Sequence, residues 1–175
     1  MKLALYLVLM IPTVLWSQET SGPKGNHDLS IYVSPDFEGV TGDTLDLAAG
    51  YGYYFFDRLA LRAAFDLATV EDIAPGEKDY RFREIDAGLQ YDLGRWRAVL
   101  AYVGVSLGLA SLTYLDFHDS SFVYGPDAGL EYFFTEKVAI DFAVSFRNAS
   151  KNVFVNDFIL EDSDLTSSIG LRVRF

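Results

Sequence analysis

Residues 165–175 read LTSSIGLRVRF, and the fold can be inferred from their pattern. Apolar side chains recur at every second position from Ile169 to Phe175, whereas the positions between them hold glycine or arginine. Alternation with a period of two is typical of a β-strand that has one apolar and one polar face. The sequence therefore predicts that the chain ends on a strand whose last residue is the aromatic Phe175.

Seven further segments alternate in the same way. Most of them approach the length of about 9 to 11 residues that a tilted transmembrane strand needs. Pro35 interrupts the first segment, and the two glycines of the fifth, Gly104 and Gly108, favour a bend. The seven segments span residues 29–34, 45–55, 59–67, 84–93, 98–109, 127–134 and 138–147.

The connections between these strands alternate in length. Short turns are expected at residues 56–58, 94–95 and 135–137, and longer polar segments at residues 38–43, 69–80, 112–121 and 148–164. An up-and-down barrel with an even number of strands places every short turn at one end and every long loop at the other. We therefore predict an all-β fold, an eight-stranded antiparallel up-and-down transmembrane β-barrel.

The chemistry of the two faces separates a membrane barrel from a soluble one. A soluble barrel such as a lipocalin carries long charged side chains outside, whereas here the second face combines Gly, Ala and Ser with charges of both signs. Such a mixture suits the crowded lumen of an eight-stranded barrel. Arg83 and Arg97, the exceptions on the apolar face, lie near strand ends, where an arginine can reach the headgroups. The aromatic residues near the short turns resemble an interfacial girdle: Tyr53, Phe55, Tyr91, Trp96, Tyr132, Phe134 and Phe175.

The first 17 residues have the composition of a secretory signal peptide. Lys2 precedes an apolar run over residues 3–11, and the small residue Ser17 precedes a polar segment. The run is shorter than the roughly 20 residues of a membrane helix. We expect a signal peptide over residues 1–17, a short periplasmic segment over residues 18–27 and an outer-membrane barrel domain over residues 28–175.

Composition excludes several classes of function. The chain has 175 residues, no cysteine and a formal net charge of -11. It therefore has no disulfide framework, no thiol chemistry and no cysteine-based metal site. Nucleic acid is not an expected partner, because phosphate binding of that kind needs concentrated Lys and Arg. The two histidines lie far apart, and neither has the ligand spacing of a metal site.

Three segments resemble the small outer-membrane barrels of the OmpX-like and OmpA-like family. They are residues 87–91 (AGLQY), 128–134 (AGLEYFF) and 169–175 (IGLRVRF). The last is similar to the C-terminal signal that the barrel assembly machinery reads, in which Phe175 is the terminal aromatic. The resemblance covers roughly residues 28–175. It implies the outer membrane of a Gram-negative-type bacterium, both termini in the periplasm, and contact with outer-membrane lipids and lipopolysaccharide. The sequence departs from the OmpA-like plan in one respect, since we expect no peptidoglycan-binding domain after Phe175.

On this fold eight acids and four arginines point into the lumen. Buried charges must be paired, hydrated or neutralised. Since eight strands leave little free lumen, we expect a structural network of salt bridges that fills it. The inward charges are Asp46, Arg62, Asp66, Glu84, Asp86, Asp92, Asp127, Glu131, Asp141, Arg147, Arg172 and Arg174.

Three functions follow, in decreasing order of support. The first is a structural, envelope-interaction or adhesion role for a barrel with a side-chain-filled lumen. The second is a narrow, porin-like channel that prefers cations, because inward acids outnumber arginines; unpaired acids could also take up protons. The third is a lipid A-modifying enzyme, for which residues 117–121 (FHDSS) offer a histidine, an acid and a serine. Triad partners usually come from separate elements, so we predict no catalytic, cofactor-binding or metal-binding residue.

The long loops are the remaining candidates for interaction. Residues 71–79 and 156–164 are rich in acids, and such loops could bind divalent cations that bridge to lipid phosphates, although a solvated loop is the simpler interpretation. Apolar residues between Val153 and Leu160 are expected either to extend a hairpin beyond the membrane or to add a strand to an extracellular partner.

Overall fold

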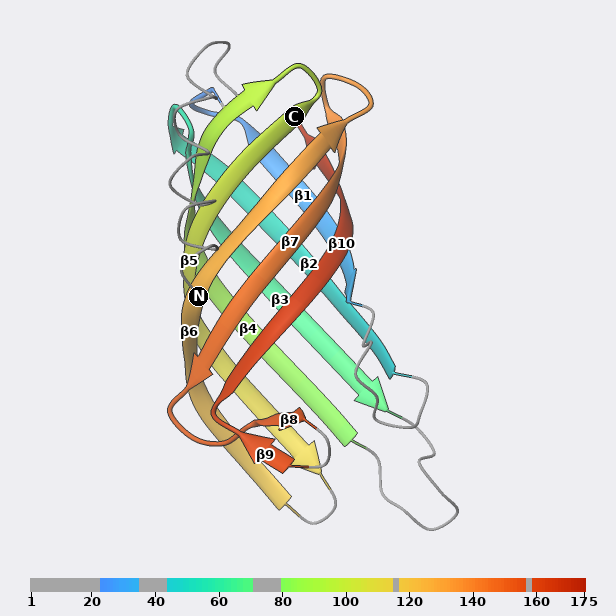
Figure 1. Cartoon of the computed structure of the whole chain (residues 1–175). Coiled ribbons are helices and arrows are strands. Elements are labelled where there is room, and N and C mark those ends of the chain that lie inside the picture. The colour runs from blue at the N-terminus through green and yellow to red at the C-terminus, as the bar shows by residue number, and fades with distance from the viewer. Residues whose placement is uncertain (1–22, 35–43, 71–79, 115–116, 157–158) are drawn as a thin grey trace, which may run out of the picture.

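The computed structural model describes residues 23–34, 44–70, 80–114, 117–156 and 159–175 (Figure 1). The predicted signal peptide, residues 1–17, lies outside these ranges, as does the first half of the predicted periplasmic segment, residues 18–27. The described residues contain no helix long and apolar enough to span a membrane.

Eight antiparallel strands close into one barrel, as the alternation predicts. Each strand pairs with the next along the chain, and the first pairs with the last to close the sheet. A short two-stranded sheet, β8 (Phe154–Asn156) with β9 (Ile159–Glu161), lies outside the barrel order. The barrel strands are β1 (His27–Ser34), β2 (Thr44–Phe56), β3 (Leu59–Val70), β4 (Tyr80–Trp96), β5 (Val99–Tyr114), β6 (Phe117–Phe133), β7 (Val138–Ala149) and β10 (Ser163–Arg174).

The apolar face of the strands points outward, which confirms a transmembrane barrel rather than a soluble one. Ile31, Ile85 and Leu107, from three different strands, are each more than half exposed. A soluble barrel would bury such side chains in its interior. A hydrocarbon environment around the barrel removes the cost of exposing them.

One of the two tightest turns differs from the prediction. The β4–β5 turn was expected at residues 94–95 but is formed by Arg97 and Ala98, and Arg97 has a φ of 53°. The expectation is wrong because an irregularity between Asp92 and Gly94 interrupts the regular pairing, after which β4 continues to Trp96. The β2–β3 turn lies at Asp57–Arg58, within the predicted residues 56–58.

The loop predicted over residues 112–121 is also wrong. β5 continues to Tyr114 and β6 begins at Phe117, with unbroken pairing from Leu112↔Asp119 to Tyr114↔Phe117. Polar composition suggested a loop, but the polar His118 and Ser120 alternate with other residues and lie exposed on the outside of a long hairpin. Alternation therefore outweighs polarity in this segment.

Both ends of the described chain lie at the end of the barrel that carries the short turns (Figure 1). β10 ends at Arg174, and Phe175 continues the ladder through two backbone hydrogen bonds with His27, of 2.8 and 2.9 Å. The Phe175 side chain is exposed on the outer wall, and its ring stacks on that of His27 with centroids 5.8 Å apart. This end is called the short-turn end below, and the opposite one the long-loop end.

The segment after β7 folds inward at the long-loop end. Val153 and Phe154 are 0% and 7% exposed. The Val153 amide donates to the Glu161 carbonyl at 3.1 Å, which ties the segment to β9. These two side chains therefore pack inside the barrel rather than on a hairpin that extends beyond the membrane, because they gain an apolar contact there, whereas the addition of a strand to a partner stays a prediction. Their neighbours, with which they form the apolar cap, are Phe82, Ala110, Leu112, Val123 and Ala149.

Candidate functional site: the charged lumen

The polar face of the strands points inward and divides into two groups. The group nearer the short-turn end is called the arginine network: Asp28, Tyr32, Tyr54, Arg62, Gln90, Asp92, Tyr102, Glu131, Asp141, Arg172 and Arg174. The group nearer the long-loop end is called the carboxylate cluster: Asp66, Glu84 and Asp86, with Arg147 beside it.

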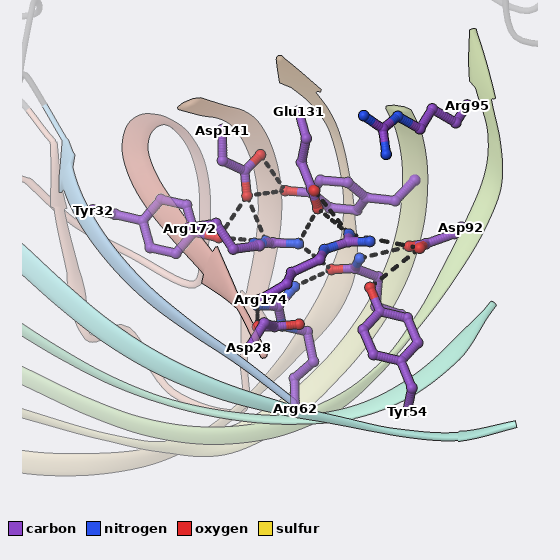
Figure 2. Close-up of polar contacts among 12 residues, drawn as sticks. Asp28, Tyr32, Tyr54, Arg62, Asp92, Arg95, Glu131, Asp141, Arg172 and Arg174 are labelled. Carbon is purple, nitrogen blue, oxygen red and sulfur yellow. Dashed lines mark hydrogen bonds and ion pairs between the residues drawn. The ribbon is translucent and has the colours of Figure 1, made fainter. Parts of the chain in front are cut away.

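Arg172 lies at the centre of the arginine network (Figure 2). It comes from β10, is 1% exposed, and forms ion pairs with Glu131 of β6 and Asp141 of β7. Its Nη2 also donates to the Tyr32 hydroxyl at 2.5 Å, and its guanidinium lies 5.1 Å from the centre of the Tyr102 ring. One guanidinium thus joins strands from most of the barrel circumference.

Arg174 extends the network toward the short-turn end. Its Nη2 donates to both oxygens of Glu131, at 2.8 and 3.0 Å, and lies 3.6 Å from Oδ2 of Asp92. The guanidinium also lies 5.3 Å from the ring centre of Tyr54 and 5.1 Å from that of Phe133. Charge-assisted hydrogen bonds and aromatic faces therefore surround this cation on several sides.

Arg62 completes the network on the opposite wall. Its Nη2 donates to Oδ1 of Asp28 at 2.7 Å, and its Nη1 is hydrogen-bonded to Gln90. Gln90 Nε2 then donates to Oδ1 of Asp92 at 2.9 Å, and the Tyr54 hydroxyl donates to Oδ2 of the same carboxylate at 3.1 Å. Amide and phenol groups thus connect the ion pairs into one continuous set.

The arginine network fills its part of the lumen with nearly balanced charge. Its three arginines face four acids, and the four acids are each 0% exposed: Asp28, Asp92, Glu131 and Asp141. Buried charges are tolerated only when they are paired and hydrogen-bonded. The ion pairs compensate most of these charges, and the acids make no contact with solvent, but Asp28 Oδ2 and Arg172 Nε have no hydrogen-bond partner among the described residues.

The carboxylate cluster has the opposite balance. Carboxylate oxygens of Asp66, Glu84 and Asp86 lie within 4.8 Å of one another. The nearby cation is Arg147, whose Nε is 3.5 Å from Oε1 of Glu84, a longer contact than those of the arginine network. Among the described residues neither Glu84 Oε1 nor Arg147 Nη1 has a hydrogen-bond partner. Oxygen donors in this arrangement suit a hard cation.

Ten of the twelve inward charged residues predicted from the sequence, all but Asp46 and Asp127, divide between the two groups. Six lie in the arginine network and four in or beside the carboxylate cluster, so the structure does not join them into one set. The sequence interpretation did not include five residues of the network. Their positions in the alternating pattern mark all five as inward-facing. Four of them carry no formal charge: Tyr32, Tyr54, Gln90 and Tyr102. The fifth, Asp28, precedes the predicted start of the first strand.

Residues 117–121 do not assemble a catalytic triad. Because they form part of β6, successive side chains alternate between the two faces of the wall. His118 is exposed and its Nδ1 is hydrogen-bonded to Thr113 Oγ1 at 2.8 Å, whereas Asp119 pairs with Lys151 Nζ at 2.8 Å. The histidine thus contacts a threonine rather than the acid and serine that a triad requires.

The chain belongs to the outer membrane protein β-barrel domain family, whose model matches residues 3–175. Its strands therefore cross the outer membrane. No curated protein matches the sequence closely enough to indicate a relative.

Solved outer-membrane barrels have a similar fold. The N-terminal β-barrel domain of Pseudomonas aeruginosa OprF aligns with a TM-score of 0.62 and 16% identity, over 87% of this chain and 98% of that one. Neisserial surface protein A aligns with a TM-score of 0.56 and 20% identity, over 86% and 95% of the two chains. Ail, the attachment invasion locus protein of Yersinia pestis, aligns with a TM-score of 0.52 and 18% identity, over 87% and 99%. At these identities the likeness concerns the fold alone.

Proposed function

We propose that this protein is a non-conducting outer-membrane barrel with a structural or envelope-interaction role, which acts through its outer wall and its long-loop end. The observation that carries the proposal is the filling of the lumen at two levels. The arginine network occupies the part near the short-turn end, and the apolar cap of Val153 and Phe154 lies near the long-loop end. A lumen of eight strands is only just wide enough for side chains.

The proposed orientation places the short-turn end and both termini in the periplasm. It is supported by the general plan of bacterial barrels, in which periplasmic turns are short and extracellular loops are long. On this orientation the hairpin of β5 and β6 and the segment around β8 and β9 face the cell exterior. The barrel assembly machinery would be the partner during biogenesis, with Phe175 in its recognition signal.

Single-channel recording tests the proposal. The protein is extracted from outer membranes in detergent and inserted in a planar bilayer, and only preparations whose gel mobility shifts on boiling are used, because that shift reports a folded barrel. We expect no conductance steps. Discrete, cation-preferring steps would reject the filled-lumen role.

A narrow cation pathway is the second candidate, and the carboxylate cluster is the observation that favours it. Three carboxylates beside one arginine would attract cations into the long-loop half of the lumen. In that case Glu84→Gln and Asp66→Asn would lower cation selectivity in the same recordings.

A lipid A-modifying enzyme is the least supported candidate. It would require His118→Ala to change the lipid A profile of cells that overproduce the protein.

A further inference from the structure

Two rows of polar residues cross the outer wall at the long-loop end, on the face that elsewhere meets hydrocarbon. Strand pairing sets Ser111 of β5 between Arg83 of β4 and Ser120 of β6. The next row, two residues further along each strand, has Thr113 between Arg81 and His118. All six side chains are exposed except Thr113, which is half-buried. These six residues are called the outer-wall patch.

The patch begins where the apolar wall ends. The preceding row consists of Ile85, Leu109 and Phe122, which are 61%, 61% and 44% exposed. Trp96 marks the opposite end of the same strand, 13 positions after Arg83. At about 3.3 Å per residue and a tilt of about 45°, that separation spans about 30 Å of membrane, slightly more than an apolar band of about 25 Å. Arg83 therefore lies at the headgroup level.

The two arginines have no acidic partner in the part of the chain that the structure describes. Neither Arg81 nor Arg83 takes part in any of the ion pairs found there, although the whole chain has a net charge of -11. An arginine on the lipid face is costly at mid-membrane, but the cost becomes small at the interface, where headgroup anions are within reach. Charge complementarity thus indicates an anion supplied by the membrane.

The geometry of the patch suits a phosphate group. A guanidinium presents paired N–H donors that match two phosphate oxygens. Arg81 and Arg83 lie on one face of one strand, so their Cα atoms are about 7 Å apart. Ser111 places its hydroxyl group beside Arg83, and Ser120 places a second one a strand further on, beside Ser111. His118 uses Nδ1 in its hydrogen bond with Thr113, which leaves Nε2 as the ring nitrogen that can reach a ligand.

We propose that the outer-wall patch binds the phosphorylated headgroup of an outer-leaflet lipid. Arg81 and Arg83 hold the phosphate, and Ser111, Ser120 and His118 supply further hydrogen bonds. The proposal deepens the proposed function and rests on its orientation, since the long-loop end must face the outer leaflet for such a lipid to reach the patch.

Lipid titration tests the proposal. Isotope-labelled protein in zwitterionic detergent micelles is titrated with diphosphorylated lipid A, and affinity is measured from shifts of backbone amide and arginine Nε–H signals. We expect the Arg81→Gln/Arg83→Gln double variant to bind about tenfold more weakly or worse, because charge-assisted hydrogen bonds are lost. The Arg81→Lys/Arg83→Lys variant should bind more tightly than the glutamine double variant but more weakly than the wild type, since lysine keeps the positive charge but lacks the paired N–H donors of the guanidinium.

The matched control is Arg97→Gln, which removes an exposed outer arginine at the short-turn end and should leave the affinity unchanged. Dephosphorylated lipid A should bind to the wild type as weakly as diphosphorylated lipid A binds to the double variant. Equal binding of the two lipids by the wild type, or full affinity in the double variant, would overturn the proposal. Inorganic phosphate that displaced the lipid at equal concentration would assign the patch to a soluble anion instead.

A gel-mobility shift on boiling shows that each variant is folded. His118→Ala is a second, milder change on another strand, and we expect it to weaken lipid binding less than the double variant does. Binding in micelles does not depend on whether the lumen conducts. Failure of the lipid experiment is therefore distinguishable from failure of the filled-lumen role, which single-channel recording tests.

Discussion

The two halves of the lumen are lined by the same strands, but their buried charges are paired differently. In the short-turn half, three arginines face four acids, and the carboxylates of Glu131 and Asp141 are fully buried in close ion pairs. In the long-loop half, Asp66, Glu84 and Asp86 lie beside one arginine at a longer distance. The two halves thus differ in how their charges are paired rather than in the presence of charge.

The largest expected effect comes from removing the central cation of the short-turn half. Arg172→Ala removes the cation that pairs with Asp141 and one of the two that pair with Glu131, and the loss of one member of a buried ion pair costs about 3–5 kcal/mol. The free energy of unfolding in urea, followed by Trp96 fluorescence in lipid vesicles, measures the effect. A loss below about 1 kcal/mol would show that the network contributes little to stability.

A Glu-to-Gln substitution in each half tests the difference in charge pairing. Glu131→Gln removes an acid that pairs with both Arg172 and Arg174, and we expect a loss of about 2–3 kcal/mol. Glu84→Gln removes one of three neighbouring negative charges, so stability should stay unchanged or rise, because like-charge repulsion decreases. Equal losses in the two variants, measured by the same unfolding experiment, would show that the two halves do not differ in charge pairing.

The apolar cap gives a smaller and more local effect. Phe154→Ala removes a ring that is 7% exposed and lies 6.0 Å from the ring centre of Phe82. Large-to-small changes in a core cost about 3–5 kcal/mol, and we expect about 2 kcal/mol here because a short surface segment can relax. Protease cleavage within residues 150–162 should become faster while the barrel strands stay protected. Unchanged cleavage would indicate that Phe154 does not hold the segment in place.

The sequence predicted the barrel well because its information is local. Alternation from Ile169 to Phe175, and in the other strands, assigns each side chain to the lumen or the lipid without knowledge of its neighbours. The errors arose where a second factor intervened. The irregularity between Asp92 and Gly94 moved one turn, and alternation within the polar residues 118–121 continued a strand that composition had suggested was a loop.

The partition of the lumen could not be predicted from alternation. Which acid meets Arg172 depends on barrel closure and on the stagger between strands, and these bring Glu131 and Asp141 to a residue of the last strand. The inward turn of Val153 and Phe154 likewise depends on a non-local apolar contact with Leu112 and Val123. Both features come from tertiary packing rather than from local pattern.

The most direct test of a lumen closed at two levels is single-channel recording of the wild type beside the Arg172→Ala/Phe154→Ala double variant. Both proteins must show the gel-mobility shift of a folded barrel. We expect a silent wild type and cation-preferring steps in the double variant, which lacks the centre of the arginine network and the ring of the apolar cap. Steps in the wild type, or silence in a folded double variant, would contradict this expectation.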